Sequence, residues 1–415
     1  MKYDVTEIIR DASYCLNCKN KPCKFGCPLG NNIPDFIKYI KEQKNSEAFE
    51  VLSETTIFEP ICGRICPQKK QCEGSCVRGI KGQSVEIGRL EKFVGDYALE
   101  NKIKQKVMPA IGKKIAVIGS GPAGLAVANY LSTKGYLVTI YEKHSKLGGL
   151  LRYGIPEFRL SKKLLDSWLE NYVLNKNIEV KTNTKLGRDI TLEQLKEKYE
   201  KIILSFGANV SNKMNIPGKE LEFVLGGNEL LEYRKMPDFK DKKVVVIGGG
   251  NVAIDSARTI KKLGAKSVNI IYRRSETEMP AEKKEIEEAK KEKIEFTFQT
   301  NILKISTGDL INKVECIKTK LVPSKTEDRK YPVNIENSNY TIDTNYVIMA
   351  IGSKADKKTI NELNLETTSW GYIKVDENYK TTDNKIYAIG DLIGNKQTVA
   401  WAAKSGFECA KRICK

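Results

Sequence analysis

Hydrophobic and polar positions divide the chain into stretches of different period. Residues 34–54 (PDFIKYIKEQKNSEAFEVLSE) carry apolar side chains at helical spacing, at Phe36, Ile37, Ile40, Phe49 and Leu52. We therefore expect residues 1–100 to form a small helical domain. Residues 101–112 (NKIKQKVMPAIG) lack such a pattern and are interpreted as a linker.

Short apolar runs dominate the rest of the chain. KKIAVIGSGPAGLAVANYLSTKGYLVTIYEK, from residue 113, has the pattern of a strand, a glycine turn, a helix and a second strand. DKKVVVIGGGNVAIDSARTIKKLGAKSVNIIYRR, from residue 241, repeats it. KIILSFGAN and YVIMAIGSK are predicted to close the two sheets. The fold class is α/β, with an N-terminal helical domain before two Rossmann-like nucleotide-binding domains.

The composition is that of an ordinary globular protein. The 415 residues are 40% hydrophobic and 29% charged, and no apolar run reaches the ~18 residues that a membrane helix needs. The N-terminus lacks a signal-peptide core, so a cytoplasmic location is expected. The net charge of +18 comes mainly from lysines mixed with glutamates, which favours a solvated surface over nucleic-acid binding. Such a surface still steers acidic electron-transfer partners.

Cysteines are concentrated near the N-terminus. Eight of the eleven lie between Cys15 and Cys76, spaced Cys-x2-Cys-x4-Cys-x3-Cys-Pro from Cys15 and Cys-x3-Cys-x5-Cys-x3-Cys from Cys62. The x3-Cys-Pro ending is typical of ferredoxin-like runs, whereas structural zinc sites usually show two CxxC pairs. The spacing therefore favours iron–sulfur clusters over a pair of zinc ions.

The first glycine turn predicts a dinucleotide site. Gly119 makes the tight turn, Gly121 admits a pyrophosphate, and Gly124 lets the helix pack on the strand. Glu142 follows the second strand, where an acid binds ribose hydroxyls. Strand, helix and acid together make this a strong signal.

The second turn has Gly248, Gly250 and Ala253, and its second strand ends in Arg273-Arg274 where the first motif has an acid. A guanidinium pairs with a 2′-phosphate that an acid would repel, so NADPH is favoured over NADH. Two surface arginines are the alternative.

Two nucleotide folds in series indicate a flavoprotein, with FAD in one fold and a nicotinamide in the other. The later string Ala388-Ile389-Gly390-Asp391 offers a second glycine–acid contact for the flavin. No cysteine lies between Cys76 and Cys316, so the dithiol of a disulfide reductase is missing there. The N-terminal clusters are the expected route for electrons leaving the flavin.

The order of these motifs resembles the small (β) subunit of bacterial glutamate synthase. The matching strings are CGRICP, QCEGSC, GSGPAGL, GGLLRYGIPEFRL, GGGNVAID, YRR followed by MPA, and AIGD. The same module resembles the electron-input half of dihydropyrimidine dehydrogenase and a subunit of electron-bifurcating NADH–ferredoxin:NADP oxidoreductases. The match to the module is strong, and the module is shared.

The resemblance implies two sets of cluster ligands. One [4Fe–4S] cluster takes Cys15, Cys18, Cys23 and Cys76, and the other takes Cys27, Cys66, Cys72 and Glu91. Cys62 then packs nearby without binding iron. A surface carboxylate is the alternative interpretation of Glu91.

The resemblance also implies contacts to the two nucleotides. No catalytic acid or base is expected, because hydride transfer needs alignment and exclusion of water more than a proton-transferring group. The single His144 is expected at the surface. The expected cofactor-binding residues are Gly119, Gly121, Pro122, Ala123, Gly124, Glu142, Gly149, Leu150, Arg159, Gly352, Gly390, Asp391, Thr398 and Val399 on the FAD side, and Gly249, Gly250, Asn251, Val252, Arg273 and Arg274 on the NADPH side. Trp401 departs from the family pattern and leaves its flavin contacts open.

The predicted function is electron transfer from NADPH through FAD and two [4Fe–4S] clusters to a partner subunit or a ferredoxin-like acceptor. The alternatives are the input subunit of a dihydropyrimidine dehydrogenase, a ferredoxin:NADP oxidoreductase, and a redox sensor or scaffold. The predicted domains are 1–108 for the clusters, 109–235 with 346–415 for FAD, and 236–345 for NADPH.

Overall fold

The computed structural model describes residues 3–232, 236–323, 329–394 and 396–415. Contacts divide the chain into two compact units. The first comprises residues up to 152 with 157–207 and 357–415, and the second comprises 153–156 and 208–356. Within the described residues, no helix is both long and apolar enough to cross a membrane.

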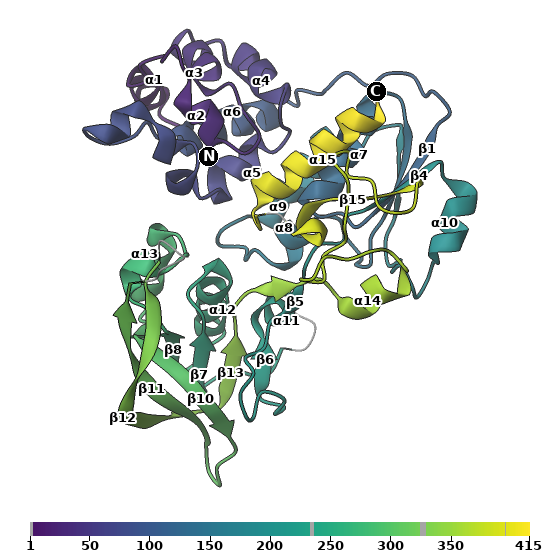
Figure 1. The fold of residues 1–415 in the computed structure, drawn as a ribbon. Helices are drawn as coiled ribbons and strands as arrows, with labels where there is room; N and C mark the ends of the chain where they lie inside the picture. The colour runs from purple at the N-terminus through teal and green to yellow at the C-terminus, as the bar shows by residue number, and fades with distance from the viewer. Residues whose placement is uncertain (1–2, 233–235, 324–328, 395) are drawn as a thin grey trace. The chain divides into compact units, whose positions relative to one another are not determined.

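The N-terminal part of the first unit is helical, as predicted, and its helices group together in Figure 1. Phe36, Ile37, Ile40, Phe49 and Leu52 are all buried, so the apolar period marks the core. The elements are α1 (Val5–Ser13), α2 (Pro22–Gly26), α3 (Ile33–Lys41), α4 (Asn45–Ser53), α5 (Glu59–Ile65) and α6 (Ile87–Glu100), with short turns η1 (Gln68–Lys70), η2 (Glu73–Ser75) and η3 (Val77–Ile80).

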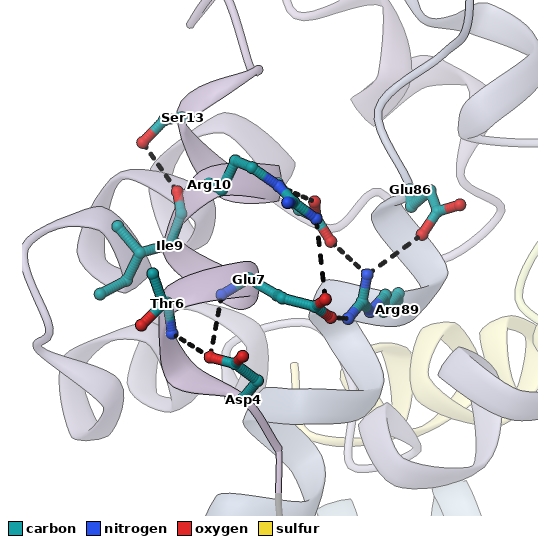
Figure 2. Close-up of polar contacts among 9 residues, drawn as sticks. Asp4, Thr6, Glu7, Ile9, Arg10, Ser13, Glu86 and Arg89 are labelled. Atoms are coloured by element: carbon teal, nitrogen blue, oxygen red, sulfur yellow. Dashed lines mark hydrogen bonds and ion pairs between the residues drawn. The ribbon is translucent and has the colours of Figure 1, made fainter.

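Ion pairs fasten α1 to α6, as Figure 2 shows. The Arg89 guanidinium contacts Glu7 at 2.7 Å and Asp11 at 2.5 Å, and Asp4 caps α1 by accepting from the Thr6 N–H at 2.9 Å. Arg89 thereby holds the helix that ends just before Cys15.

A parallel five-stranded sheet forms the centre of the first unit, in the order β15-β4-β1-β2-β3. The helix α7 follows β1 directly, which confirms the predicted strand–turn–helix–strand. The C-terminal helix α15 packs along α7, because Gly406 brings it so close that a Cβ would lie 2.4 Å from the Ala123 oxygen. The elements are β1 (Lys114–Ile118), α7 (Pro122–Thr133), β2 (Leu137–Tyr141), α8 (Leu150–Tyr153), α9 (Lys162–Trp168), η4 (Leu169–Val173), β3 (Ile178–Lys181), α10 (Leu192–Lys198), β4 (Lys201–Leu204), α14 (Lys357–Glu362), β15 (Ile386–Ala388), η6 (Gly390–Ile393) and α15 (Val399–Ile413).

The helical part and this sheet share one core. The Trp168 indole N–H donates to the Ile57 carbonyl at 2.5 Å, and its ring lies 4.9 Å from that of Phe58. Phe58 also meets Phe407 of α15 edge-on, at 6.4 Å. Since Trp168 and Phe58 are fully buried, α5 is anchored on the sheet domain by apolar packing.

The second unit has its own parallel sheet, in the order β6-β13-β7-β8-β9, and an antiparallel sheet of β10, β11 and β12. The helix α12 follows β7 and repeats the arrangement of α7 after β1. The elements are β5 (Val210–Ser211), β6 (Val224–Gly226), α11 (Gly227–Leu231), β7 (Lys243–Ile247), α12 (Asn251–Lys262), β8 (Ser267–Tyr272), η5 (Glu276–Glu278), α13 (Lys283–Lys291), β9 (Glu295–Phe298), β10 (Thr300–Ser306), β11 (Asn312–Val322), β12 (Tyr331–Thr344), β13 (Tyr346–Met349) and β14 (Ser353–Lys354).

Contacts group three segments differently from the predicted domains. Residues 153–156, 208–232 and 346–356 were expected with the FAD domain, and contacts group them with the second sheet. The physical reason is strand pairing: β13 lies between β6 and β7, parallel to both.

Candidate cofactor sites

The first four predicted cluster ligands face one cavity. Cys15, Cys18, Cys23 and Cys76 line it together with apolar side chains that include Ile33, Ile37, Val85 and Ile87. Cys15 follows α1, Cys23 lies on α2, and Cys76 separates η2 from η3. The close approach of α2 to η2 requires glycine at 26, because a Cβ there would lie 2.3 Å from the Ser75 hydroxyl oxygen.

The second predicted set also lies together, with Cys66 directly after α5 and Glu91 on α6. Burial raises the pKa of Cys27 to about 12 and that of Cys72 well above its usual range, and the nearby Glu91 and Cys66 raise both further. A hydrogen bond with Cys66 raises the pKa of Cys62. The Cys62 thiol, which is not a predicted ligand, therefore lies beside this set, as expected. Among the described residues, no three such side chains converge tightly enough to hold a single metal ion.

Glu91 is buried, so the alternative of a surface carboxylate is wrong. It is only 5% exposed, and burial raises its pKa to about 8 against the opposing effect of Asn31. The Asn31 amide donates to Glu91 Oε1 at 3.1 Å and accepts from Thr55 at 2.8 Å. A buried carboxylate without a cation is costly, and a cluster iron would supply the missing positive charge. No motif or spacing pointed to the orienting role of Asn31.

The first glycine turn leaves open space at the N-terminus of α7, as a phosphate cradle would require. Gly119 has φ +102°, and its ideal Cβ would lie 2.8 Å from the Phe206 backbone. At Gly124 a Cβ would meet the Gly119 oxygen at 2.1 Å, whereas at Gly121 the nearest atom is 4.0 Å away. No side chain caps the N-terminus of α7. Pro122 begins the helix and has no N–H, so the N–H groups of Ala123 and Gly124 are the first that face the space beside Gly121.

Two further predicted segments lie against this turn. A Cβ at Gly149 would lie 2.6 Å from the Gly121 Cα, and one at Gly390 would lie 3.0 Å from Ala123 Cβ. Leu150 follows as the first residue of α8, and Arg159 is half-buried in the segment before α9.

Glu142 is held by the turn itself. Its carboxylate accepts from the Ser120 N–H at 3.0 Å and the Ser120 hydroxyl at 2.5 Å, and the other oxygen accepts from the His144 N–H at 2.9 Å. Ser120 also accepts from the Gly148 N–H at 3.0 Å. Ser120 therefore joins the acid to the Gly149 turn, a role that sequence reasoning missed although the residue lies within the glycine motif. His144 is half-buried and not fully at the surface.

Asp391 carries a buried oxygen without a partner. Oδ1 makes no hydrogen bond within the described part of the chain, and burial raises the pKa of the carboxyl to about 6. Ser405 accepts from the Gly390 N–H at 2.8 Å and fixes the turn. Thr398 caps α15 by accepting from the Trp401 N–H, and Val399 begins the helix. An orphaned acceptor beside the α7 cradle fits a ligand that donates a hydroxyl.

The second glycine turn repeats the first within its own unit. Gly248 has φ +144°, and a Cβ there would lie 2.2 Å from the Ala350 oxygen. Gly249 packs on the Tyr272 ring, and Gly250 leaves open space before α12, whose N-terminus no side chain caps. Asn251 accepts from the Glu282 N–H at 3.1 Å, and Val252 is half-buried beside it. Gly352, with φ +109°, is exposed after β13 in the same unit.

The two arginines after β8 have different surroundings. Arg274 is buried and donates through Nε to the Lys330 carbonyl at 2.8 Å, whereas Arg273 is exposed. Arg329, which the sequence did not single out, donates to the Glu278 carbonyl and the Tyr272 hydroxyl, both at 2.6 Å. Of the predicted pair, Arg273 is the guanidinium that is free to meet a phosphate.

Comparison with known proteins agrees with this architecture. Residues 113–406 match the family described as pyridine nucleotide-disulphide oxidoreductase, and residues 1–103 match dihydropyrimidine dehydrogenase domain II, 4Fe-4S cluster. The chain is 33% identical to the glutamate synthase [NADPH] small chain of Azospirillum brasilense, over 97% of this chain and 87% of that one. The corresponding chain of Escherichia coli is 32% identical, over 97% and 90%.

Solved structures show the same fold at low identity. Mycobacterium tuberculosis FprA in complex with NADPH is 17% identical with a TM-score of 0.65, and covers 74% of this chain and 84% of its own. With two matched families and near full-length relatives, the chain belongs to the pyridine nucleotide-disulphide oxidoreductase family and is an oxidoreductase of the glutamate synthase small-chain type, with an N-terminal 4Fe-4S domain.

Proposed function

We propose that the chain oxidises NADPH at a bound FAD and passes the electrons through two [4Fe–4S] clusters to a partner subunit or a ferredoxin-like acceptor. The observation that carries this proposal is the joint presence of two separate ligand sets and two glycine cradles in one chain. Its likeness to glutamate synthase [NADPH] small chains over 97% of its length supports the same assignment.

In this proposal the side chains and backbone of the protein bind the cofactors, and none of them acts as a general acid or base. In this proposal the N-termini of α7 and α12 bind the two pyrophosphates, Glu142 binds the FAD ribose, and Asp391 accepts from a flavin-side hydroxyl. FAD would supply the change from two-electron to one-electron chemistry when bound. We assign no general acid or base, because hydride transfer depends on alignment and exclusion of water.

The ligand sets fit two clusters. The cavity of Cys15, Cys18, Cys23 and Cys76 would hold one, and Cys27, Cys66, Cys72 and Glu91 would hold the other. Trp168 and Phe58 join the second set to the flavin-side sheet within one unit. That continuity supports electron flow from flavin to cluster, and the absence of cysteine between Cys76 and Cys316 removes the usual dithiol route.

A partner subunit is proposed from the relatives. Two relatives are named glutamate synthase [NADPH] small chain, and a Geobacter sulfurreducens relative is named NADPH-Fe(3+) oxidoreductase subunit beta. The input subunit of a dihydropyrimidine dehydrogenase and a free-standing ferredoxin:NADP oxidoreductase share the same input chemistry. A pure redox sensor or scaffold would show no NADPH turnover with an artificial acceptor.

Iron analysis of matched variants tests the ligand sets. Anaerobically purified protein should carry about eight irons, for two cubane clusters. Cys18→Ser and Cys66→Ser should each lower this to about four, because each removes a ligand from a different cluster. Cys62→Ser is the matched control, since it changes a buried thiol beside the second set without removing a ligand.

NADPH should bleach the flavin absorbance near 450 nm in the wild type and in all three variants. The proposal fails if reconstituted protein binds no iron, or if NADPH leaves the flavin oxidised. Loss of iron in Cys62→Ser to the same extent as in Cys66→Ser would contradict the assignment of the second set.

A further inference from the structure

The surface around the first ligand set combines apolar and basic side chains. Leu16 and Val77 are exposed and also line the cavity of Cys15, Cys18, Cys23 and Cys76. Phe25, two positions after Cys23 on α2, is 83% exposed, and Ile80 on η3 is 77% exposed. We call Leu16, Phe25, Val77 and Ile80 the exit patch.

A neighbouring hollow and a close helix–turn contact link Ile80 and Phe25 to the same ligand set. Ile80 lines a second hollow with Cys76, Lys69 and Gln83. On the other side, the contact of Gly26 with Ser75 joins α2, which carries Phe25, to the turn before Cys76. Single exposed apolar side chains are normal, but several around one ligand set mark a surface that another molecule covers.

The charge around the exit patch has one sign. Segments 14–30 and 67–82 contain seven basic residues and one acidic residue, Glu73. Glu73 is buried and paired with Lys69 at 3.1 Å, so it contributes little negative potential. Lys19, Lys69, Lys70 and Lys81 are exposed. An apolar centre with a basic rim matches an acidic protein, which such a field also steers during encounter.

We infer that the exit patch is the docking surface for a small acidic iron–sulfur protein that carries one electron at a time. This inference rests on the proposed function and names its acceptor. For each NADPH oxidised to NADP⁺ and one proton, two oxidised carriers each take one electron. The two carriers dock in turn over the first ligand set, which is the set whose lining residues reach the surface.

Patch variants with matched controls test the inference. The probe is a small acidic ferredoxin with one [2Fe–2S] cluster, and menadione serves as a neutral acceptor that needs no docking protein. Ile80→Glu and the double variant Lys19→Glu/Lys81→Glu should each lower kcat/KM for the ferredoxin about tenfold, because they repel or fail to pack against it. Menadione reduction and iron content should stay at the wild-type level.

Leu310→Glu and Lys104→Glu are the controls. Leu310 is 99% exposed in the second unit, and Lys104 is exposed beyond the end of α6. The inference would be overturned if patch and control variants reduced ferredoxin with the same kcat/KM. It would also be overturned if the wild type reduced a basic cytochrome c with the same kcat/KM as the acidic ferredoxin and neither value changed with salt concentration. If NADPH fails to reduce menadione or the flavin, the proposed function itself is wrong.

The complex purified from its own cells tests whether the exit patch binds a free carrier or a permanent subunit. If ferredoxin is reduced only after a large subunit is stripped away, the exit patch belongs to a permanent subunit and the carrier assignment falls. Reduction of ferredoxin by the intact complex, with the same sensitivity to Ile80→Glu, supports a free carrier.

Discussion

Arg273 and Arg274 are adjacent in sequence, but the structure gives them different tasks. Arg274 is buried and donates a hydrogen bond through Nε to a backbone carbonyl, whereas Arg273 is exposed to solvent. A charged hydrogen bond to a phosphate is worth about 1.5–3 kcal/mol. Arg273→Ala should therefore raise the KM for NADPH about tenfold or more and leave NADH nearly unchanged.

The matched variant is Arg274→Ala. It leaves the Lys330 carbonyl without its donor, so it should lower stability and impair both coenzymes alike. Steady-state kinetics with NADPH and NADH, beside thermal melts, distinguish the two. If Arg273→Ala weakens both coenzymes equally, the 2′-phosphate assignment is wrong.

Asp391 gives a pH-dependent prediction for the flavin-free protein. Its pKa is about 6 in the folded chain against 3.8 for an ordinary aspartate, so the folded state holds the proton more tightly. The resulting loss of stability is absent below pH 3.8, grows through this window, and is complete above pH 6.

Asp391→Asn removes that titration. Above pH 6 the flavin-free variant should be more stable than wild type, by on the order of 2 kcal/mol, while its affinity for FAD falls. Urea unfolding at pH 5 and pH 8 together with FAD titration measures both effects. A stability gain of the same size at both pH values would contradict the role of the buried carboxyl.

At the residue scale, the sequence was enough to select Glu91 as a candidate ligand but not to find the residues that orient the two acids. Glu91 was singled out through the family resemblance, and its burial among cysteines agrees with that choice. Asn31 and Ser120 were missed because their roles are hydrogen bonds to residues 60 and 22 positions away. Contacts of that kind leave no periodic or spacing signal.

At the scale of elements, two glycines in the turn before and within α7 have different roles, one in folding and one in binding. A Cβ at Gly124 would meet the Gly119 oxygen at 2.1 Å, so Gly124→Ala should destabilise the strand–helix unit. At Gly121 a Cβ has no protein neighbour closer than 4.0 Å, and φ is −71°, which alanine adopts freely. Gly121→Ala should keep the fold and lose FAD affinity at least tenfold, because the methyl group occupies the phosphate cradle.

Thermal melts of the flavin-free variants and FAD titration check this contrast. Unchanged FAD binding in Gly121→Ala would place the pyrophosphate elsewhere. Both glycines belong to one motif, and only the geometry distinguishes their tasks.

Strand–turn–helix patterns were predictable because local periodicity and glycine spacing determine them. The pairing of strands was not predictable, because it joins residues far apart in the chain. β13 (Tyr346–Met349) lies between β6 (Val224–Gly226) and β7 (Lys243–Ile247), both far from it in the chain, and its apolar run fits any parallel sheet. The predicted boundary at 346 therefore placed this strand with the FAD domain, whereas contacts place it in the second unit.

At the scale of the whole first unit, Trp168 joins the N-terminal helical part to the domain of the first parallel sheet. It is fully buried, bonded to Ile57 and packed on Phe58. Trp168→Ala should cost about 3–5 kcal/mol, whereas Trp168→Phe keeps most of the packing and should lose about 1 kcal/mol with the hydrogen bond. Cluster absorbance and circular dichroism should decay together during unfolding of the wild type. Separate transitions in the wild type would show that the shared core is not cooperative.

The division of the chain also determines the order in which its parts become complete on the ribosome. Residues 208–356 form one continuous insertion between β4 and β15, two neighbouring strands of the first sheet. Since synthesis proceeds at about 5–20 residues per second, this insertion emerges whole while the first sheet still lacks an edge strand and α7 lacks its cover, α15. The flavin cradle is thus finished last, and a chain stopped before residue 386 would expose the apolar flank of α7 to chaperones and proteases.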